Sequence, residues 1–182
     1  MKKLIAVAAA LLFALPAGAD VEVDRIMDAS PDGHVDITNI SGSVEVNGWS
    51  RDEVEVTGTL GKNVEELIFE RNGDKITIKV KVPRRQSRGI DSDLQVSVPE
   101  QSSIDVGAVS AEIDVAYVRG EQRLNTVSGD VETESTGGDV AAESVSGDVE
   151  VSGNRIEGET HASTVSGDFT LFRMAGKVST ES

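Results

Sequence analysis

The sequence predicts an all-β protein in which an antiparallel β start continues into a parallel β-solenoid (β-helix-like) of 18–20-residue rungs. Three observations predict this class: a repeated phrase close to Val-Ser-Gly-Asp-Val, short runs that alternate apolar and polar residues, and no helical periodicity after residue 20. The phrase occupies residues 109–115, 127–133, 145–151 and 165–171, so its copies begin at nearly regular intervals. Regular self-similarity of this kind is typical of stacked repeats.

Composition predicts a thin, valine-lined core. Aromatic residues make up only 3% of the chain, whereas large aromatic side chains dominate the cores of most thick globular domains. There is no cysteine, which excludes disulfides and a lipid on an N-terminal Cys. Stability must therefore come from burial and backbone pairing.

Residues 1–19 have the three parts of a secretory signal peptide. Lys2 and Lys3 precede the apolar run 4–15, and Ala-Gly-Ala at 17–19 provides a small-residue cleavage site. The apolar run is too short to cross a bilayer as a helix of about 20 residues, so cleavage is favoured over a retained anchor. We expect an exported protein, periplasmic or at the cell surface or secreted, with no transmembrane segment after cleavage.

The formal net charge is −15, and loss of Lys2 and Lys3 makes the remaining chain still more acidic. Such a field repels nucleic acid and favours cations or basic partners. We therefore expect no nucleic-acid function.

Residues 20–99 are expected to form an N-terminal β region. Alternating runs occur at 21–23, 35–37, 44–46 and 54–56, and Asn72-Gly73 between runs 67–69 and 76–80 predicts a hairpin. These runs predict an antiparallel meander up to residue 83. Prolines on both sides of 94–98 predict a boundary strand after an exposed loop. That loop carries Arg84, Arg85 and Arg88, which could dock an anionic glycan or lipid but are favoured as solvated surface.

Residues 100–182 are expected to form the solenoid repeats, continuous with the N-terminal region. The phrase glycines suit backbone conformations outside the β region, and the residues after them alternate, which places every second side chain on one inner face. The inner pairs would be Ile113 and Val115, Val131 and Thr133, Val149 and Val151, and Phe169 and Leu171; the glycines are Gly129, Gly147 and Gly167.

The end of the chain repeats an earlier stretch, because 175–182 matches 137–144. In the earlier copy a full phrase follows at once, whereas here none follows. Stacked repeats normally finish with a polar cap. The sequence is therefore expected either to be truncated at the C-terminus or to self-associate through its open last rung.

No catalytic constellation is recognisable. His34 and His161 lie outside any Ser or Asp motif and are favoured as surface or turn residues, and no His or Cys set suits zinc. Trp49 could stack on a sugar ring but is favoured as a plug at the end of the thin core. We predict a non-enzymatic protein without cofactors.

Carboxylates form the one constellation of interest. If the copies stack in parallel register about 4.8 Å apart, Asp130, Asp148 and Asp168 form one column. A second column, on the outward face, contains Asp114, Glu132 and Glu150. Repulsion between them would raise their pKa values, and calcium could relieve it. The Asp130, Asp148 and Asp168 column is therefore a candidate calcium site, although turn formation by Asp is favoured.

Several motifs in this order resemble a bacterial family known as "putative adhesin", a domain of unknown function with β-repeats that is similar to auto-transporter adhesin head domains. The motifs are residues 39–46 with Gly48-Trp49, residues 52–58, residues 93–99, and the Val-Ser-Gly-Asp-Val phrases. The resemblance implies export and a β-repeat build. It carries over no catalytic residue.

These observations predict an exported, adhesin-like binding or scaffolding module of the bacterial cell envelope, whose partner is an envelope protein or glycan. One alternative is a polysaccharide-active solenoid enzyme that uses calcium, acidic ligands and a basic residue. Against it, Arg119, Arg123 and Arg155 keep no fixed relation to the acidic columns. A second alternative is a self-assembling envelope scaffold.

Overall fold

The chain folds into strands alone in the part that the computed structural model describes, residues 20–85, 88–153, 158–173 and 176–181. No helix there could cross a membrane. The expected signal peptide, residues 1–19, lies outside the described residues. The strands are β1 (Val21–Asp28), β2 (His34–Trp49), β3 (Glu53–Leu60), β4 (Glu66–Asn72), β5 (Lys75–Lys81), β6 (Ser92–Pro99), β7 (Ser103–Val118), β8 (Gln122–Ser128), β9 (Val131–Ser135), β10 (Val140–Ser146), β11 (Val149–Gly153), β12 (Glu159–Ser166), β13 (Phe169–Phe172) and β14 (Lys177–Glu181).

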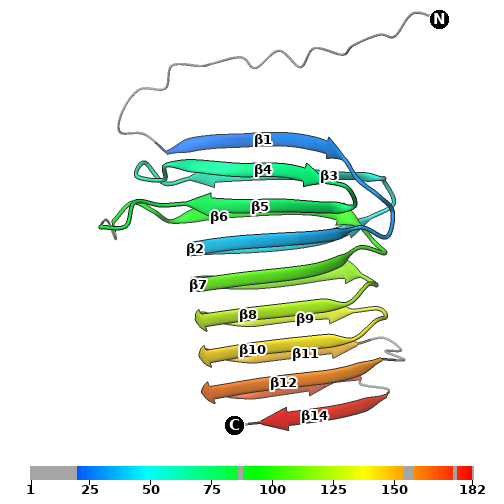
Figure 1. The fold of residues 1–182 in the computed structure, drawn as a ribbon. Coiled ribbons are helices and arrows are strands. Elements are labelled where there is room, and N and C mark those ends of the chain that lie inside the picture. Colours follow the sequence, from blue (N-terminus) through cyan, green and yellow to red (C-terminus); the bar gives the residue numbers. More distant parts are fainter. Residues whose placement is uncertain (1–19, 86–87, 154–157, 174–175, 182) are drawn as a thin grey trace, which may run out of the picture.

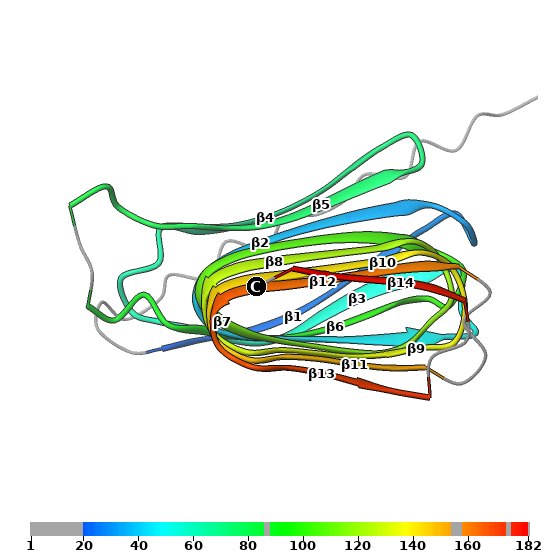
Figure 2. The ribbon, with the colours of Figure 1, turned by 90° about the horizontal axis from the view of Figure 1, so that it is seen from below.

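The strands stack as layers of a flattened coil (Figure 1). Viewed along the stack, the layers formed by β2, β7, β8–β9, β10–β11 and β12–β13 run across one face, turn a rounded corner and return across the other (Figure 2). The 16-residue strands β2 and β7 make this turn without a break. We call the face with β4, β5, β8, β10, β12 and β14 the front sheet, and the face with β1, β3, β6, β9, β11 and β13 the back sheet; β2 and β7 contribute their first halves to the front sheet and their second halves to the back sheet.

The rungs have the predicted parallel register. On the front sheet Gln122 of β8 pairs with Val140 of β10, and Val140 pairs with Thr160 of β12, one repeat further along the chain each time. On the back sheet Val131, Val149 and Phe169 align in the same way. The repeated phrase therefore forms the rounded corner, where the front strand ends and the back strand begins.

The antiparallel start is confirmed, but the meander expected over residues 20–83 is only partly present. β1 pairs with β3, β3 with β6, and β4 with β5, all antiparallel, and the predicted hairpin turns at Asn72-Gly73 with a φ of 65° at Gly73. β2, however, pairs in parallel with β5, β6 and β7, and so forms the first rung. The expected boundary strand, β6, instead lies inside the back sheet between β3 and β2.

The core is a narrow layer between the two sheets. It consists mostly of Val and Ile side chains that are almost fully buried, such as Ile37, Ile113 and Val149. Several polar side chains are buried as well, among them a bonded pair: Thr133 Oγ1 donates to Gln122 Oε1 at 2.7 Å, and Gln122 Nε2 donates to the Val118 carbonyl at 3.1 Å. These bonds satisfy groups that would otherwise be costly to bury.

The last rung is less buried than predicted. Phe169 and Leu171 align with the inner residues Val149 and Val151, yet Phe169 is 38% exposed and Leu171 is half-buried. The reason is that β13 pairs only with β11 among the described strands, so one side of its side chains stays uncovered.

Candidate functional site

The outer surface of the back sheet carries aligned carboxylates. The register of β2, β7, β9 and β11 places Glu45, Asp114, Glu132 and Glu150 in one column, one residue per rung. Parallel strands lie about 4.8 Å apart, so successive carboxylates are close neighbours. The predicted column is confirmed, and Glu45 extends it by one rung.

The electrostatics of this column agree with its geometry. The pKa of Asp114 is raised by partial burial first and then by the charges of Glu45 and Glu112. The pKa of Glu132 is also raised by burial first, followed by Asp114, Glu150 and Glu112. Strands β3, β6, β9, β11 and β13 of the back sheet contain no Lys or Arg, so none of them supplies a cation to the column.

The calcium candidates form a ladder along the corner. Asp130 Oδ1 accepts the backbone N–H of Asp148 at 2.8 Å, and Asp148 Oδ1 accepts that of Asp168 at 2.8 Å. The backbone is paired in the opposite direction, because the N–H of Val131 donates to the Asp148 carbonyl at 2.9 Å. One oxygen of each of the first two carboxylates is thus used to hold the next rung. Within the described ranges, no group of three or more His, Cys, Asp and Glu side chains is arranged to hold a metal ion.

Hydroxyl groups form hydrogen bonds between rungs on the inner side of the same corner. Each donates to a backbone carbonyl of the preceding rung, at 3.0 to 3.2 Å. The pairs are Thr126 with Ala111, Ser144 with Gly129, and Thr164 with Gly147. Backbones approach so closely there that a Cβ built at Gly147 would overlap the Gly129 carbonyl, and one at Gly167 would overlap that of Gly147. Close approach between rungs thus explains Gly147 and Gly167. Gly129 has a φ of 152°, so the conformation expected from the sequence is present there.

A groove of about 500 Å³ runs along the outside of the front sheet beside the corner. Its wall is a column of valines, Val109, Val127, Val145 and Val165, which are 45%, 49%, 46% and 72% exposed. They are the first residues of the four repeated phrases. Sequence reasoning used these residues as markers of the repeat and missed that they point outward as a continuous apolar stripe.

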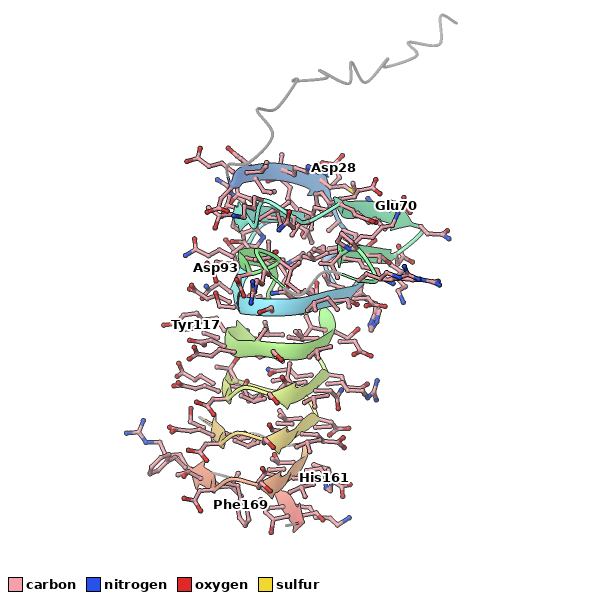
Figure 3. The ribbon with its side chains drawn as sticks, turned by 90° about the vertical axis from the view of Figure 1, so that its left-hand side faces the viewer. Asp28, Glu70, Asp93, Tyr117, His161 and Phe169 are labelled. Carbon is pink, nitrogen blue, oxygen red and sulfur yellow. The ribbon has the colours of Figure 1, made fainter. Side chains whose placement is uncertain are left out.

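The two histidines lie apart from this groove and join no catalytic set among the described residues. His34 Nδ1 lies 3.1 Å from Ser103 Oγ across the first two rungs. His161 lines a hollow of about 190 Å³ on the front sheet with Glu121, Asp139 and Glu159. Figure 3 shows His161 on the side opposite Tyr117 and Asp93.

Trp49 neither enters the core nor offers a free ring. It is half-buried where β2 ends, its indole N–H donates to the Glu53 carbonyl at 2.8 Å, and the Arg51 guanidinium lies 4.6 Å from the ring centroid. The prediction that Trp49 plugs the end of the core is therefore wrong, because its side chain packs at the outer turn instead.

The arginines singled out from the sequence are dispersed. Arg84, Arg85 and Arg88 lie in the loop before β6. Arg123 pairs with Glu121 at 2.9 Å and Asp105 at 3.8 Å, and Arg119 pairs with Glu100 at 3.4 Å. The third arginine of the enzyme alternative, Arg155, lies outside the described residues.

Comparison with known proteins supports the resemblance inferred from the motifs. Residues 117–180 match the model of a family described as Toastrack DUF4097. The resemblance to an adhesin-like domain of unknown function is confirmed. The Toastrack match covers the rungs from the end of β7 to β14 and agrees with the solenoid-like stack. No curated protein matches the chain.

One solved structure shares the fold at low sequence identity, and two others match with lower TM-scores. A "putative cell adhesion protein" from Clostridium sporogenes is 11% identical, with a TM-score of 0.55 over 88% of this chain and 99% of the other. A "putative adhesin" from Parabacteroides distasonis is 13% identical, with a TM-score of 0.32 over 90% and 97%. A "putative lipid binding protein" from the same species is 11% identical, with a TM-score of 0.34 over 88% and 96%. Of these three, the first is similar enough to bear on the fold.

Proposed function

We propose that this chain is an exported, non-enzymatic binding module of the bacterial cell envelope, which holds an envelope protein or glycan against the outer surface of its stacked sheets. The observation that carries the proposal is the aligned outer surface of the back sheet, where carboxylates repeat on successive rungs and the β3, β6, β9, β11 and β13 strands carry no Lys or Arg. Such a surface favours basic or cation-bearing partners. The adhesion name of the Clostridium sporogenes structure is in keeping with this role.

Binding to purified envelope fractions tests the proposal. Residues 20–182, labelled with a fluorophore, are incubated with peptidoglycan sacculi and with outer-membrane vesicles. We expect retention on one of these fractions and a loss of retention in a variant with Glu132→Gln, Glu134→Gln and Glu150→Gln. A matched variant with Glu65→Gln, Glu66→Gln and Glu70→Gln removes the same charge from exposed positions next to and within β4, on the front sheet, and should bind as the wild type does. Retention on neither fraction would contradict the proposal.

Export is tested separately by cell fractionation. The full chain should be found in the periplasm, at the surface or in the medium, and mass spectrometry should show that it lacks the segment 1–19. A full-length product in the cytoplasm would contradict export.

The enzyme alternative has its own test. The full chain is assayed for hydrolysis or elimination on a panel of acidic polysaccharides, with Arg123→Ala as the variant. We expect no turnover. Activity that Arg123→Ala abolishes would overturn the non-enzymatic assignment.

A second candidate role, self-assembly, is favoured by the last rung. Phe172 and Val178 are 52% and 41% exposed, and β13 and β14 each pair on one side only among the described strands. Unpaired strand edges with apolar side chains are templates for association. Sedimentation of residues 20–182 should show a concentration-dependent oligomer, which disappears when one polar capping repeat is added. A monomer at all concentrations would contradict this role.

A further inference from the structure

The groove beside the corner, hereafter the corner groove, is built by the repeat itself. In each rung the outward residue two positions before the valine forms the opposite wall, and the residue between them turns toward the core. Gly107 on this opposite wall has no side chain, and nothing lies within 4 Å of the position its Cβ would occupy, so this wall is open at β7. The lining residues that matter below are Val109, Val127, Val145, Val165, Gly107 and Glu143.

The four exposed valines form one continuous apolar stripe and are not isolated apolar residues. Val109 and Val165 mark the ends of a straight stripe, and the register gives one valine per rung across four rungs. Contiguous exposed apolar surface on a soluble protein generally marks a binding site. The stripe is therefore a candidate docking surface.

The charged residues beside the valine stripe indicate which kind of partner can bind to it. Three positions after each valine, round the corner, comes a column of carboxylates formed by Glu112, Asp130, Asp148 and Asp168. Glu143 lines the groove itself. Strands β7, β9, β10, β11, β12 and β13 contain no Lys or Arg. Strand β8 carries one, Arg123, which is paired with Glu121 and Asp105. The apolar stripe thus has an acidic border, which suits a basic partner and repels a second copy of this chain.

The spacing of the valines selects the shape of the partner. Neighbouring rungs lie about 4.8 Å apart, so three steps of the column cover about 14 Å. On an α-helix, apolar residues at alternating three- and four-residue intervals rise about 5.3 Å per step, which is about 1.4 Å too long after three steps. On an extended strand, side chains of one face rise about 6.7 Å per step and lose register by about 6 Å. A helix therefore matches the column and a strand does not.

We propose that the corner groove binds a basic amphipathic helix of a partner protein, with the apolar stripe of the helix against the valines and its Lys or Arg side chains over the acidic border. The groove extends from the rung of β2 to that of β12, which is four steps or about 19 Å. A helix of about 13 residues spans this length. The inference rests on the proposed binding function, for which it names one site and one class of partner.

A synthetic peptide tests this site directly. The probe is a fluorophore-labelled helical peptide of between four and five turns, which has Leu at alternating three- and four-residue intervals and Lys along one border of that stripe. Titration of residues 20–182 should raise its fluorescence anisotropy with a Kd in the micromolar range. The combined variant Val127→Ser, Val145→Ser should weaken binding at least tenfold.

Matched controls distinguish binding in the groove from nonspecific hydrophobic binding. The combined variant Ile26→Ser, Tyr117→Ser replaces two other exposed apolar side chains, 52% and 58% exposed, and should bind the peptide as the wild type does. A peptide with Glu in place of Lys should not bind. Circular dichroism of each variant confirms that its strands are retained.

Equal binding to wild type and to the valine variant would overturn the proposal, as would equal binding of the Lys and Glu peptides. A dimer of the wild type that the valine variant loses in sedimentation would also overturn it, in favour of a second copy as the occupant. Failure here combined with retention on sacculi or vesicles would remove the groove site and leave the proposed function standing. Peptide binding without retention on either fraction would support the groove site and contradict the proposed function.

Discussion

The carboxylate of Asp130 accepts the backbone N–H of Asp148 at 2.8 Å, one full rung away. The same bond joins Asp148 to Asp168, and Asp139 Oδ1 accepts the N–H of Glu159 at 2.8 Å at the other turn. Aspartate at these turns thus stabilises the stack itself, with each side chain holding the next layer. This role explains the repeated Asp without any ligand.

Replacing Asp148 should reveal this bond. Asp148→Ala removes the acceptor for Asp168 and should lower the free energy of unfolding by about 0.5–1.5 kcal/mol, the net value of one hydrogen bond. Asp148→Asn keeps an oxygen acceptor and should cost less than half of that. Urea unfolding measures both, with Asp32→Ala in the exposed turn after β1 as a control expected to have little effect. Equal losses for Ala and Asn would argue against the ladder.

The Glu132 column should make stability depend on pH. The pKa of Glu132 is raised in the folded state, so the folded protein binds this proton more tightly than the unfolded chain does. The corresponding stabilisation is complete below the ordinary value of 4.5 and is lost as pH rises through the raised pKa. Glu132→Gln should therefore be more stable than wild type at pH 7, by about a few tenths of a kcal/mol after solvent screening, because it removes a charge that its surroundings and like-charged neighbours disfavour.

The pH comparison provides its own control. As the pH falls through the raised pKa of Glu132 towards 4, the advantage of Glu132→Gln over wild type should shrink. Urea unfolding at pH 7 and at pH 4 measures it. An advantage that is the same at both pH values would show that the charge of this column does not affect stability.

Close contact between rungs can be tested with glycine substitutions. Gly147→Ala places a Cβ against the Gly129 carbonyl and should lower stability by about 1–3 kcal/mol, the usual cost of overpacking. Gly107→Ala, whose Cβ meets nothing within 4 Å, should leave stability unchanged or raise it slightly. Thermal melts compare the two, and similar effects at both positions would contradict the tight corner.

Calcium remains a prediction to be measured at Asp130, Asp148 and Asp168. Because Asp130 and Asp148 each use one oxygen for a backbone N–H, we expect screening rather than a dedicated site. Calcium chloride and sodium chloride at equal ionic strength should then raise the melting temperature equally. A clearly larger rise with calcium, lost in Asp148→Asn, would establish the site.

The stacking of the later rungs can be predicted from the sequence, because their regular period is visible where the repeats follow one another. The first rung cannot be predicted in this way. β2 contains Ile40-Ser-Gly-Ser-Val44, which resembles the phrase, but His34 pairs with Ser103 only after β3 to β6 have intervened. That long interval hides the period, so β2 reads as two strands of an antiparallel meander.

In the candidate site, too, one part can be predicted from the sequence and another cannot. Alternation correctly placed Asp114, Glu132 and Glu150 outward, because inner and outer positions follow from the β period alone. The exposure of Val127 and Val145 could not be predicted in this way. Their position two residues before the glycine corner puts them on the outer face, and an apolar residue in a repeat is usually assigned to the core.

The most direct test of the stacked rungs is the removal of one rung in register. Deleting residues 122–139 joins Glu121 to Val140, which then occupies the position of Gln122 against Ile104. If the rungs are stacked, the shortened protein should keep its strand circular dichroism and unfold cooperatively in urea. Deleting only 122–130 should prevent folding, because it joins a front position to a back strand. If both deletions behave alike, or if the longer deletion does not fold while the shorter one does, the stacked-rung account is contradicted.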